Sequence, residues 1–373
     1  MGTLLRSYTD GGGASWIALI AKRAYSFESD REARSILGHD EIVRSPVFGE
    51  PDAHGFRSLA QDTDLFAAEK LLTDVLVDGH VHARSSVTRV DVALKVGVVS
   101  KRVRVHGDRM FTPGATATRF EQPAAFTRLP LTWQRAYGGV DRGTRGHIGS
   151  KHWGARKRGG MWPVLAYPRN PLGTGFMTDA EGDGRPTALP NFEDPDDPVT
   201  PARLVPTSPD SWLDLPVAAG FGPIDPLTFP RSLFALCPVF ETPRRPVREL
   251  ATGAVLREEL ASALERGRPA SKRIYNCAPA GQAICRFVGG ETVSLLNLHP
   301  ERELVHFQLP RTKPQLLVEP PGCRAREVEP LLQTVRIEPD QGRVTLTWAG
   351  KLQVAFPFSE EDCARMRAAA VFA

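Results

Sequence analysis

The segment VTRVDVALKVGVVSKRVRV, residues 87–105, decides the fold class. Apolar side chains recur at every second position from Val90 to Val98, and charged or small residues stand between them. This period of two is typical of a strand with one buried and one solvated face. The alternation then shifts to odd-numbered positions, where Val103 and Val105 alternate with basic residues. This second alternating run predicts a neighbouring strand.

The same alternation appears toward both ends of the chain. Residues 73–77 precede an Asp-Gly turn, and residues 305–309, 335–337 and 344–348 repeat the pattern in the C-terminal third. The last two runs are separated by Pro-Asp-Gln-Gly at 339–342, which predicts an antiparallel hairpin. We therefore expect a mainly β protein whose antiparallel sheets form two packed layers or lobes.

The middle of the chain differs in composition. Residues 163–246 hold 17 of the 32 prolines, and proline lacks the N–H donor that a strand ladder or a helix needs. A long Pro- and Gly-rich ordered loop region is expected there. Minor helices are indicated at Leu256–Gly267 by apolar spacing and after Ser359 by a capping box.

These signals divide the chain into a β-rich region and a helical tail. The β-rich region covers residues 15–357 and comprises the parts 15–120, 121–246 and 268–357. The tail, 358–373, is predicted as a C-terminal helix.

Charge and cysteine content exclude several protein classes. The formal net charge of +4 is too diffuse to indicate a nucleic-acid partner by itself. The five cysteines are sparse and lack Cys-x-x-Cys spacing, so we expect reduced thiols and no zinc knuckle. No apolar run reaches the roughly 20 residues that span a bilayer, and residues 16–21 are too short for a signal-peptide core. Cytoplasmic residence is the expectation.

Few residues point to chemistry. His80 and His82 share one face of a predicted strand, but no third ligand stands at metal-binding spacing, so neither a metal nor another cofactor is expected. No nucleophile motif is present. The alternative is a hydrolase or carbohydrate-active enzyme that uses carboxylates such as Glu193, Asp194 or Asp141.

Positive charge is concentrated between Arg142 and Arg158. Arg156, Lys157 and Arg158 end this stretch, and Trp153 lies within it. Such a loop suits docking of an acidic protein partner; a second alternative is nucleic-acid binding, with phosphates on the basic groups and a base stacked on the indole.

An ordered series of short motifs runs through the chain. It comprises Asp62-Thr63-Asp64-Leu65, Lys70, Thr73-Asp74-Val75, Gly79, Gly107-Asp108-Arg109, Trp133 to Gly139, Asn170 to Gly175, Leu189 to Glu193, Gly220 to Pro223 with Arg231, Tyr275 to Gln282, Gly290-Glu291, Leu296-Asn297-Leu298, and Phe307 to Pro310. In this order the motifs resemble the family called domain of unknown function 2169, over about residues 20–310. The resemblance implies a non-enzymatic adaptor or chaperone that binds a type VI secretion effector, or its PAAR-type tip domain, and helps load it onto the valine-glycine-repeat spike.

The motif residues have two expected roles: scaffold of an irregular β fold or direct contact with a protein partner. Glycines permit positive φ or close chain approach, asparagines beside prolines hold turns, and aromatic rings fill space between sheets. The candidates are Trp133, Arg135, Tyr137, Gly138, Gly139, Arg156, Lys157, Arg158, Asn170, Pro171, Gly173, Gly175, Asn191, Glu193, Phe221, Gly222, Arg231, Asn276 and Gln282.

Overall fold

A computed structural model describes most of the chain. The described residues are 2–10, 13–65, 70–112, 120–141, 166–167, 169–177, 186–204, 215–225, 228, 231 and 275–372. The expected helix at 256–267 and the basic residues Arg156, Lys157 and Arg158 lie outside these ranges. Within them the protein is mainly β, as the alternation predicts.

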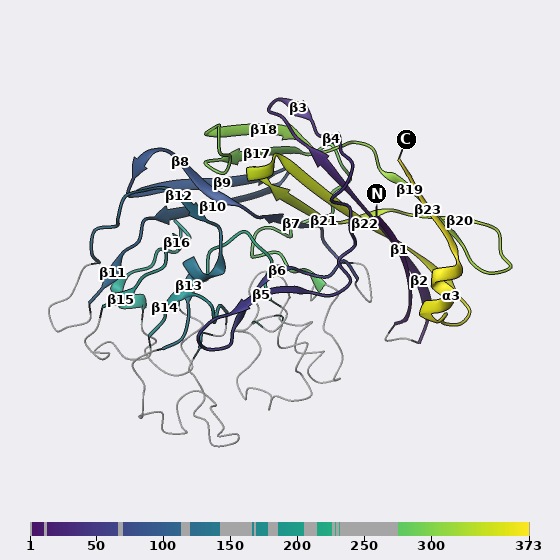
Figure 1. Cartoon of the computed structure of the whole chain (residues 1–373), viewed down its shortest axis with the longest axis horizontal. Coiled ribbons are helices and arrows are strands. Elements are labelled where there is room, and N and C mark those ends of the chain that lie inside the picture. Colours follow the sequence, from purple (N-terminus) through teal and green to yellow (C-terminus); the bar gives the residue numbers. More distant parts are fainter. Residues whose placement is uncertain are drawn as a thin grey trace, which may run out of the picture.

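The central sheet joins the two ends of the chain (Figure 1). Its order is β1 (Gly2–Thr9), β2 (Ser15–Ser26), β22 (Arg343–Val354), β21 (Leu331–Glu338) and β7 (Asp74–Val77), and β4 (Arg34–Ser35) pairs with the end of β2. The β21–β22 hairpin is antiparallel, as predicted, whereas β7 pairs with β21 in parallel. Gly342 closes the hairpin turn with a left-handed φ of 58°.

A second sheet also mixes the N-terminal and C-terminal thirds. Its order is β16 (Phe192–Glu193), β10 (Val99–His106), β9 (Arg89–Val96), β17 (Thr292–Leu296), β18 (Leu304–Gln308) and β3 (Arg31–Glu32). The two strands expected within residues 87–105 are β9 and β10, and they form an antiparallel hairpin. Because β9 also pairs with β17, the two β-rich segments of the sequence build one sheet together.

One hydrophobic core lies between these two sheets. Val335 and Ile337 of β21 belong to the same buried cluster as Leu94 of β9 and Phe307 of β18. Phe27 stacks on Phe307 with ring centroids 4.1 Å apart. The expected two packed layers therefore share their buried faces.

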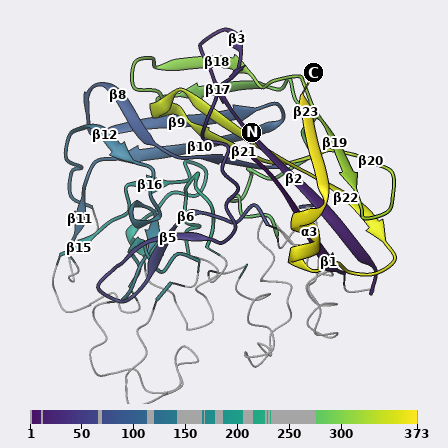
Figure 2. The same cartoon turned by 45° about the vertical axis from the view of Figure 1, so that its right-hand side comes forward.

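A small third sheet covers the far end of the central sheet. It consists of β20 (Arg326–Val328), β19 (Pro314–Glu319) and β23 (Arg367–Phe372), and it packs on apolar residues of β2. The predicted capping box is present at Ser359 and begins α3 (Glu360–Arg365). The prediction that helix occupies 358–373 is wrong beyond Arg365, because the chain then pairs with β19 as β23. Figure 2 shows α3 beside β1.

The described proline-rich segments are ordered and largely irregular, as expected. They contribute the bridges β13 (Tyr137–Gly138) to β14 (Thr174–Gly175) and β11 (Met110–Phe111) to β15 (Thr187–Ala188), and the short helix η2 (Pro201–Arg203). Tyr137, Tyr167 and Leu204 anchor them in a separate buried cluster.

Two further strand pairs and two short helices complete the described elements, and one of these helices is η6 (Pro339–Gln341) in the β21–β22 turn. The others are β5 (Val47–Pro51) with β6 (Arg57–Gln61), β8 (His80–Val87) with β12 (Phe126–Pro130), and η1 (Trp133–Arg135). Among the described residues, no helix has the length and apolar character needed to cross a membrane.

Candidate functional site

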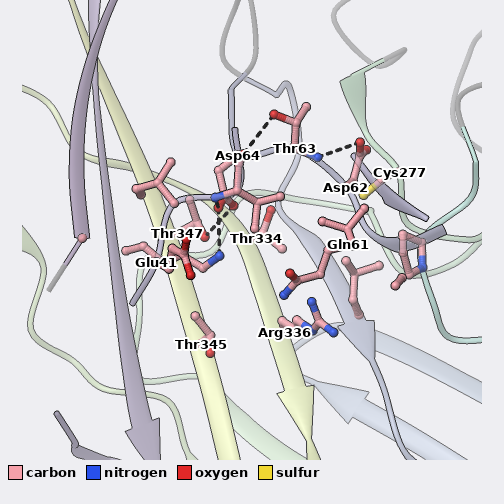
Figure 3. A pocket seen from close by; sticks show the side chains of 18 of the residues that line it. Glu41, Gln61, Asp62, Thr63, Asp64, Cys277, Thr334, Arg336, Thr345 and Thr347 are labelled. Carbon is pink, nitrogen blue, oxygen red and sulfur yellow. Dashed lines mark hydrogen bonds and ion pairs between the residues drawn. The ribbon is translucent and has the colours of Figure 1, made fainter. Parts of the chain in front are cut away.

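A cavity of about 720 Å³ lies over the polar face of the central sheet. The opposite wall is the segment from His39 to Asp64, which includes β5 and β6. Figure 3 shows Gln61 and Asp62 on one side and Thr334, Arg336, Thr345 and Thr347 on the strands of the sheet. The start of β1, at Gly2–Leu4, also lines the cavity.

The polar face follows from the alternation in β21 and β22. Val335 and Ile337 point into the core, so Thr334, Arg336 and Glu338 point the other way. The register places Thr334 opposite Thr347, Arg336 opposite Thr345 and Glu338 opposite Arg343. Polar side chains of both strands are thereby gathered in one wall of the cavity.

Most charges in this wall are already paired. Lys22 Nζ lies 2.8 Å from Asp64, Arg336 lies 2.5 Å from Asp78, and Arg343 Nε lies 2.7 Å from Glu338. Burial raises the pKa of Glu338, but hydrogen bonding from Arg343 and the charge of Arg336 outweigh it and lower the pKa overall. Glu338 is therefore ionised, and each of the three carboxylates has a basic partner within the fold.

Three lining side chains contrast with these pairs. Glu41, Arg44 and Gln61 make no side-chain hydrogen bond or ion pair to any other described residue. Glu41 and Arg44 are exposed at the rim, and Gln61 is half-buried. A carboxylate, a guanidinium and an amide are thus free to meet a ligand.

The floor of the cavity holds a buried Lys-Asp pair. Lys70 Nζ lies 2.5 Å from Asp74 Oδ2 and donates to Thr334 Oγ1 at 3.0 Å. Burial lowers the pKa of Lys70, but the charge of Asp74 raises it above its ordinary value. Asp74 also accepts from Asn276 Nδ2 at 2.8 Å and from the Cys277 amide at 3.0 Å.

The neighbouring thiol is not activated. Cys277 Sγ lies 3.3 Å from Asp74 Oδ2, and burial together with that carboxylate raises the pKa of the thiol well above its usual value. A thiol held protonated in this way is a poor nucleophile. Arg231, predicted as a site residue, pairs with Asp62 at 2.8 Å on the same side of the cavity.

A second polar cluster gathers other predicted residues away from the cavity. Glu193 accepts from His106 Nε2 at 2.6 Å and from Arg109 at 3.4 Å. Burial raises its pKa, but these two partners lower it overall. Arg135 donates to Asn191 Oδ1 at 2.9 Å, and Asn191 donates to the His106 carbonyl.

Two carboxylates of the enzyme alternative, Glu193 and Asp194, have structural contacts here. Glu193 is buried and ionised, so it lacks the raised pKa that a general acid needs. Asp194 accepts from the Asp196 amide at 2.9 Å, as in an Asx turn.

The glycine and asparagine motifs form a tight chain crossing. A Cβ at Gly138 would lie 2.1 Å from the Asn170 carbonyl oxygen, and one at Gly139 would lie 2.3 Å from that of Gly173. Asn170 Nδ2 donates to the carbonyls of Trp133 and Tyr137 at 2.8 and 3.1 Å. Close packing at this crossing excludes side chains.

The remaining predicted residues complete the interior. Trp133 donates to the Pro223 carbonyl at 2.9 Å, and Phe221 is buried. Gln282 Nε2 donates to the carbonyls of Val75 and Phe221. Four further predicted residues are half-buried: Pro171 and Gly173, in the turn that follows Asn170, together with Gly222 and Arg231. Gly222 lies beside Trp133. Gly175 is buried and lies beside Pro190. Most of these described motif residues are therefore buried or half-buried and bonded within the fold.

The histidine pair has a third partner that sequence spacing does not reveal. His80 Nδ1 and His82 Nε2 lie 2.5 and 2.7 Å from the two oxygens of Asp340, in the β21–β22 turn. Arg128 lies 3.1 Å from the same His80 nitrogen, where a bound cation would be repelled. Within the described ranges no group of three or more His, Cys, Asp or Glu residues is arranged to hold a metal.

Comparison with protein families agrees with the ordered motifs. The family model described as an uncharacterized protein conserved in bacteria (DUF2169) matches residues 12–349. The chain belongs to this family. Comparisons with curated proteins and with solved structures found no match.

The DUF2169 motifs supply only part of the cavity. Asp62, Thr63, Asp64, Lys70 and Cys277 belong to the series identified in the sequence, and all line it. Glu41, Arg44, Gln61 and Arg336 were not among the predicted site residues. For Arg336 a signal existed, because polar residues alternate with apolar ones in β21. The other three lie outside the quoted motifs, so only the folded chain brings them to the cavity.

Proposed function

We propose that this protein is a non-enzymatic adaptor or chaperone of a type VI secretion system. In this role it binds a secreted effector, or the PAAR-type tip domain of that effector, and helps to load it onto the valine-glycine-repeat spike. The basis is the resemblance to DUF2169 proteins, whose family model matches residues 12–349. The proposal concerns binding and presentation of another polypeptide.

The observation that carries the proposal is the division of charges in the cavity. Buried groups that could perform chemistry, Lys70, Asp74 and Cys277, are bonded to one another. At the rim, Glu41 and Arg44 have no such partner among the described residues. A site with a neutralised floor and free polar groups at its rim suits recognition, because none of its described side chains is poised to break a bond.

The lining also favours a polypeptide over other ligands. The described lining residues include no Phe, Tyr or Trp, so a sugar or a nucleobase would have no ring on which to stack. Lys22, Arg336 and Arg343 are paired with carboxylates, which leaves them poorly suited to a phosphate. Mixed donors and acceptors along strands match a peptide main chain and polar side chains.

The test is effector secretion from the native bacterium. We expect deletion of the gene to abolish release of at least one effector into the medium, measured by quantitative mass spectrometry, and expect that same effector or the spike protein to co-purify with the tagged protein. Unchanged secretion of every effector, with neither partner co-purifying, would refute the proposal.

Matched charge reversals locate the function on the molecule. Complementation with the double variant Glu41→Lys, Arg44→Glu should restore less secretion than wild type. Arg324→Glu, at an exposed position in the loop between β19 and β20, should restore it fully. Equal secretion from both variants would show that Glu41 and Arg44 at the cavity rim do not take part in effector binding.

A further inference from the structure

Strand β1 forms an open edge of the central sheet. It pairs with β2 over its whole length of eight residues, without a register shift, and no other strand of the described ranges pairs with it. Its sequence, GTLLRSYT, has one charged residue and no proline. An edge strand of this kind presents unpaired main-chain groups to any approaching chain.

Hydrogen bonds elsewhere determine which residues of β1 face outward. Phe27 directly follows β2 and Gly342 directly precedes β22, and the Phe27 amide donates to the Gly342 carbonyl. The bond continues the β2–β22 register, so odd-numbered residues of β2 direct their main-chain groups toward β22. Even-numbered residues of β2 therefore bond β1, through even-numbered residues of β1. The odd-numbered residues of β1, including Thr3, Leu5 and Ser7, point outward.

A second observation agrees that the odd-numbered residues of β1 direct their main-chain groups outward. The outward N–H of Ser7 is hydrogen-bonded to Cys363 in α3. Burial raises the pKa of this thiol overall, and the bond from Ser7 partly opposes that effect. Helix α3 thus covers the Ser7 end of the edge. Among the described residues, the main-chain groups of Thr3 and Leu5 have no hydrogen-bond partner.

Other long edges of the two main sheets are protected. At β7, the amides of Val75 and Val77 donate to the carbonyls of Gln282 and Phe221, so loops cover that edge. At β10, the part not covered by β16 carries Lys101 and Arg102, and such charges discourage strand pairing. The Thr3–Leu5 part of β1 has neither kind of protection.

We propose that β1 receives an extended strand of the partner polypeptide by β-strand addition at Thr3 and Leu5. The two N–H and two C=O groups of these residues would bond the incoming main chain. This inference rests on the proposed function, because it names how the partner of the adaptor is held.

The residues on either side of β1 indicate which side chains the added partner strand should carry. Leu5 packs against the same apolar cluster as Phe358 and Phe372, on the apolar side of the sheet. Leu4 lines the cavity on the other side, where Glu41 and Arg44 stand free. Side chains of an added strand alternate between these two faces, so the partner segment should alternate apolar with polar or charged residues. A second copy of β1 would bring another Leu4 to the polar face, and we therefore argue for a different polypeptide.

Proline at position 3 tests the proposal without breaking the β1–β2 ladder. The N–H of Thr3 points away from β2, and edge strands tolerate proline at such positions. Thr3→Pro removes one outward donor, whereas Thr3→Val keeps it and serves as the matched control. The probe is a phage-displayed library of random 12-residue peptides selected on the full-length wild-type protein.

We expect the selected peptides to alternate apolar and charged residues and to bind Thr3→Pro about five- to tenfold more weakly, with wild-type affinity for Thr3→Val. Bound peptide should also slow hydrogen exchange at the Thr3 and Leu5 amides of the wild-type protein. That measurement stands even if Thr3→Pro fails to fold. Strand addition would be overturned if the peptides bound all three proteins equally and did not slow hydrogen exchange at the Thr3 and Leu5 amides. It would also be overturned if the wild-type protein were a dimer that Thr3→Pro converts to a monomer.

The secretion assay separates the two proposals. If deletion stops effector release but folded Thr3→Pro restores it fully, the adaptor function stands and strand addition at β1 is wrong. If deletion leaves release unchanged while the peptides protect β1, the edge binds strands but the adaptor proposal fails.

Discussion

Lys70 shows how this chain uses a charge that has no access to water. Its ammonium contacts Asp74, and Asp74 in turn holds Asn276 and Cys277 from a segment about 200 residues later in the sequence. Each buried charge is compensated by its partner, so removal of one leaves the other desolvated and alone. The pair therefore joins distant parts of the chain at the floor of the cavity.

Substitution of Lys70 should be costly for stability. We expect Lys70→Met to lower the free energy of unfolding by about 3–5 kcal/mol, because Asp74 then lacks its counter-charge. The measurement is urea unfolding at pH 7. Lys70→Met with Asp74→Asn is the control, and it should recover part of the loss. A single variant as stable as wild type would contradict this account of the pair.

The pH dependence of stability tests the second polar cluster. Burial raises the pKa of Glu193, but His106 and Arg109 lower it overall, so in the folded state it lies below its value in the unfolded chain. The stabilisation is therefore present above the unfolded pKa, near 4, and is lost as pH falls through the folded pKa. Glu193→Gln should unfold at a lower urea concentration at pH 7, and the difference from wild type should shrink below pH 4. A difference that grows on acidification would refute the assigned sign.

At the scale of elements, local patterns predicted some strands well and others poorly. The β9–β10 and β21–β22 hairpins follow from alternation and turn residues, both of which are local signals. Residues 367–372 include three consecutive alanines, which favour helix, yet they form β23 because pairing with β19 decides their conformation. Pairing partners far away in sequence leave no local pattern.

The β21–β22 turn gives a prediction for one hairpin. Gly342 has a φ of 58°, while a Cβ there would meet only the Phe27 carbonyl at an unstrained 3.7 Å. Gly342→Ala should therefore lower stability by about 1–2 kcal/mol through backbone strain alone. Gly342→Asn should cost less, because asparagine tolerates this conformation. Thermal unfolding of the three proteins is the measurement, and equal midpoints would contradict it.

At the scale of the whole molecule, the shared core should make the two main sheets unfold together. Leu94 of one sheet and Ile337 of the other are fully buried in the same cluster. We expect Leu94→Ala and Ile337→Ala each to cost about 2–5 kcal/mol. Far-UV circular dichroism and the fluorescence of tryptophans, including buried Trp348, should report coincident urea midpoints in wild type and both variants. Separate transitions would indicate that the sheets are independent.

The sequence by itself determined the mainly β class, the two hairpins, the capping box of α3 and the family, because each depends on residues close together in the chain or on their order. It also marked Lys70, Asp62 and Cys277 as members of one series. Only the tertiary structure decided that the two β-rich segments interleave in common sheets, that most of the described motif residues are buried or half-buried, and that Glu41, Arg44 and the open edge of β1 lie at one cavity. Those relations depend on contacts between residues far apart in sequence, and alternation or composition carries no record of such contacts.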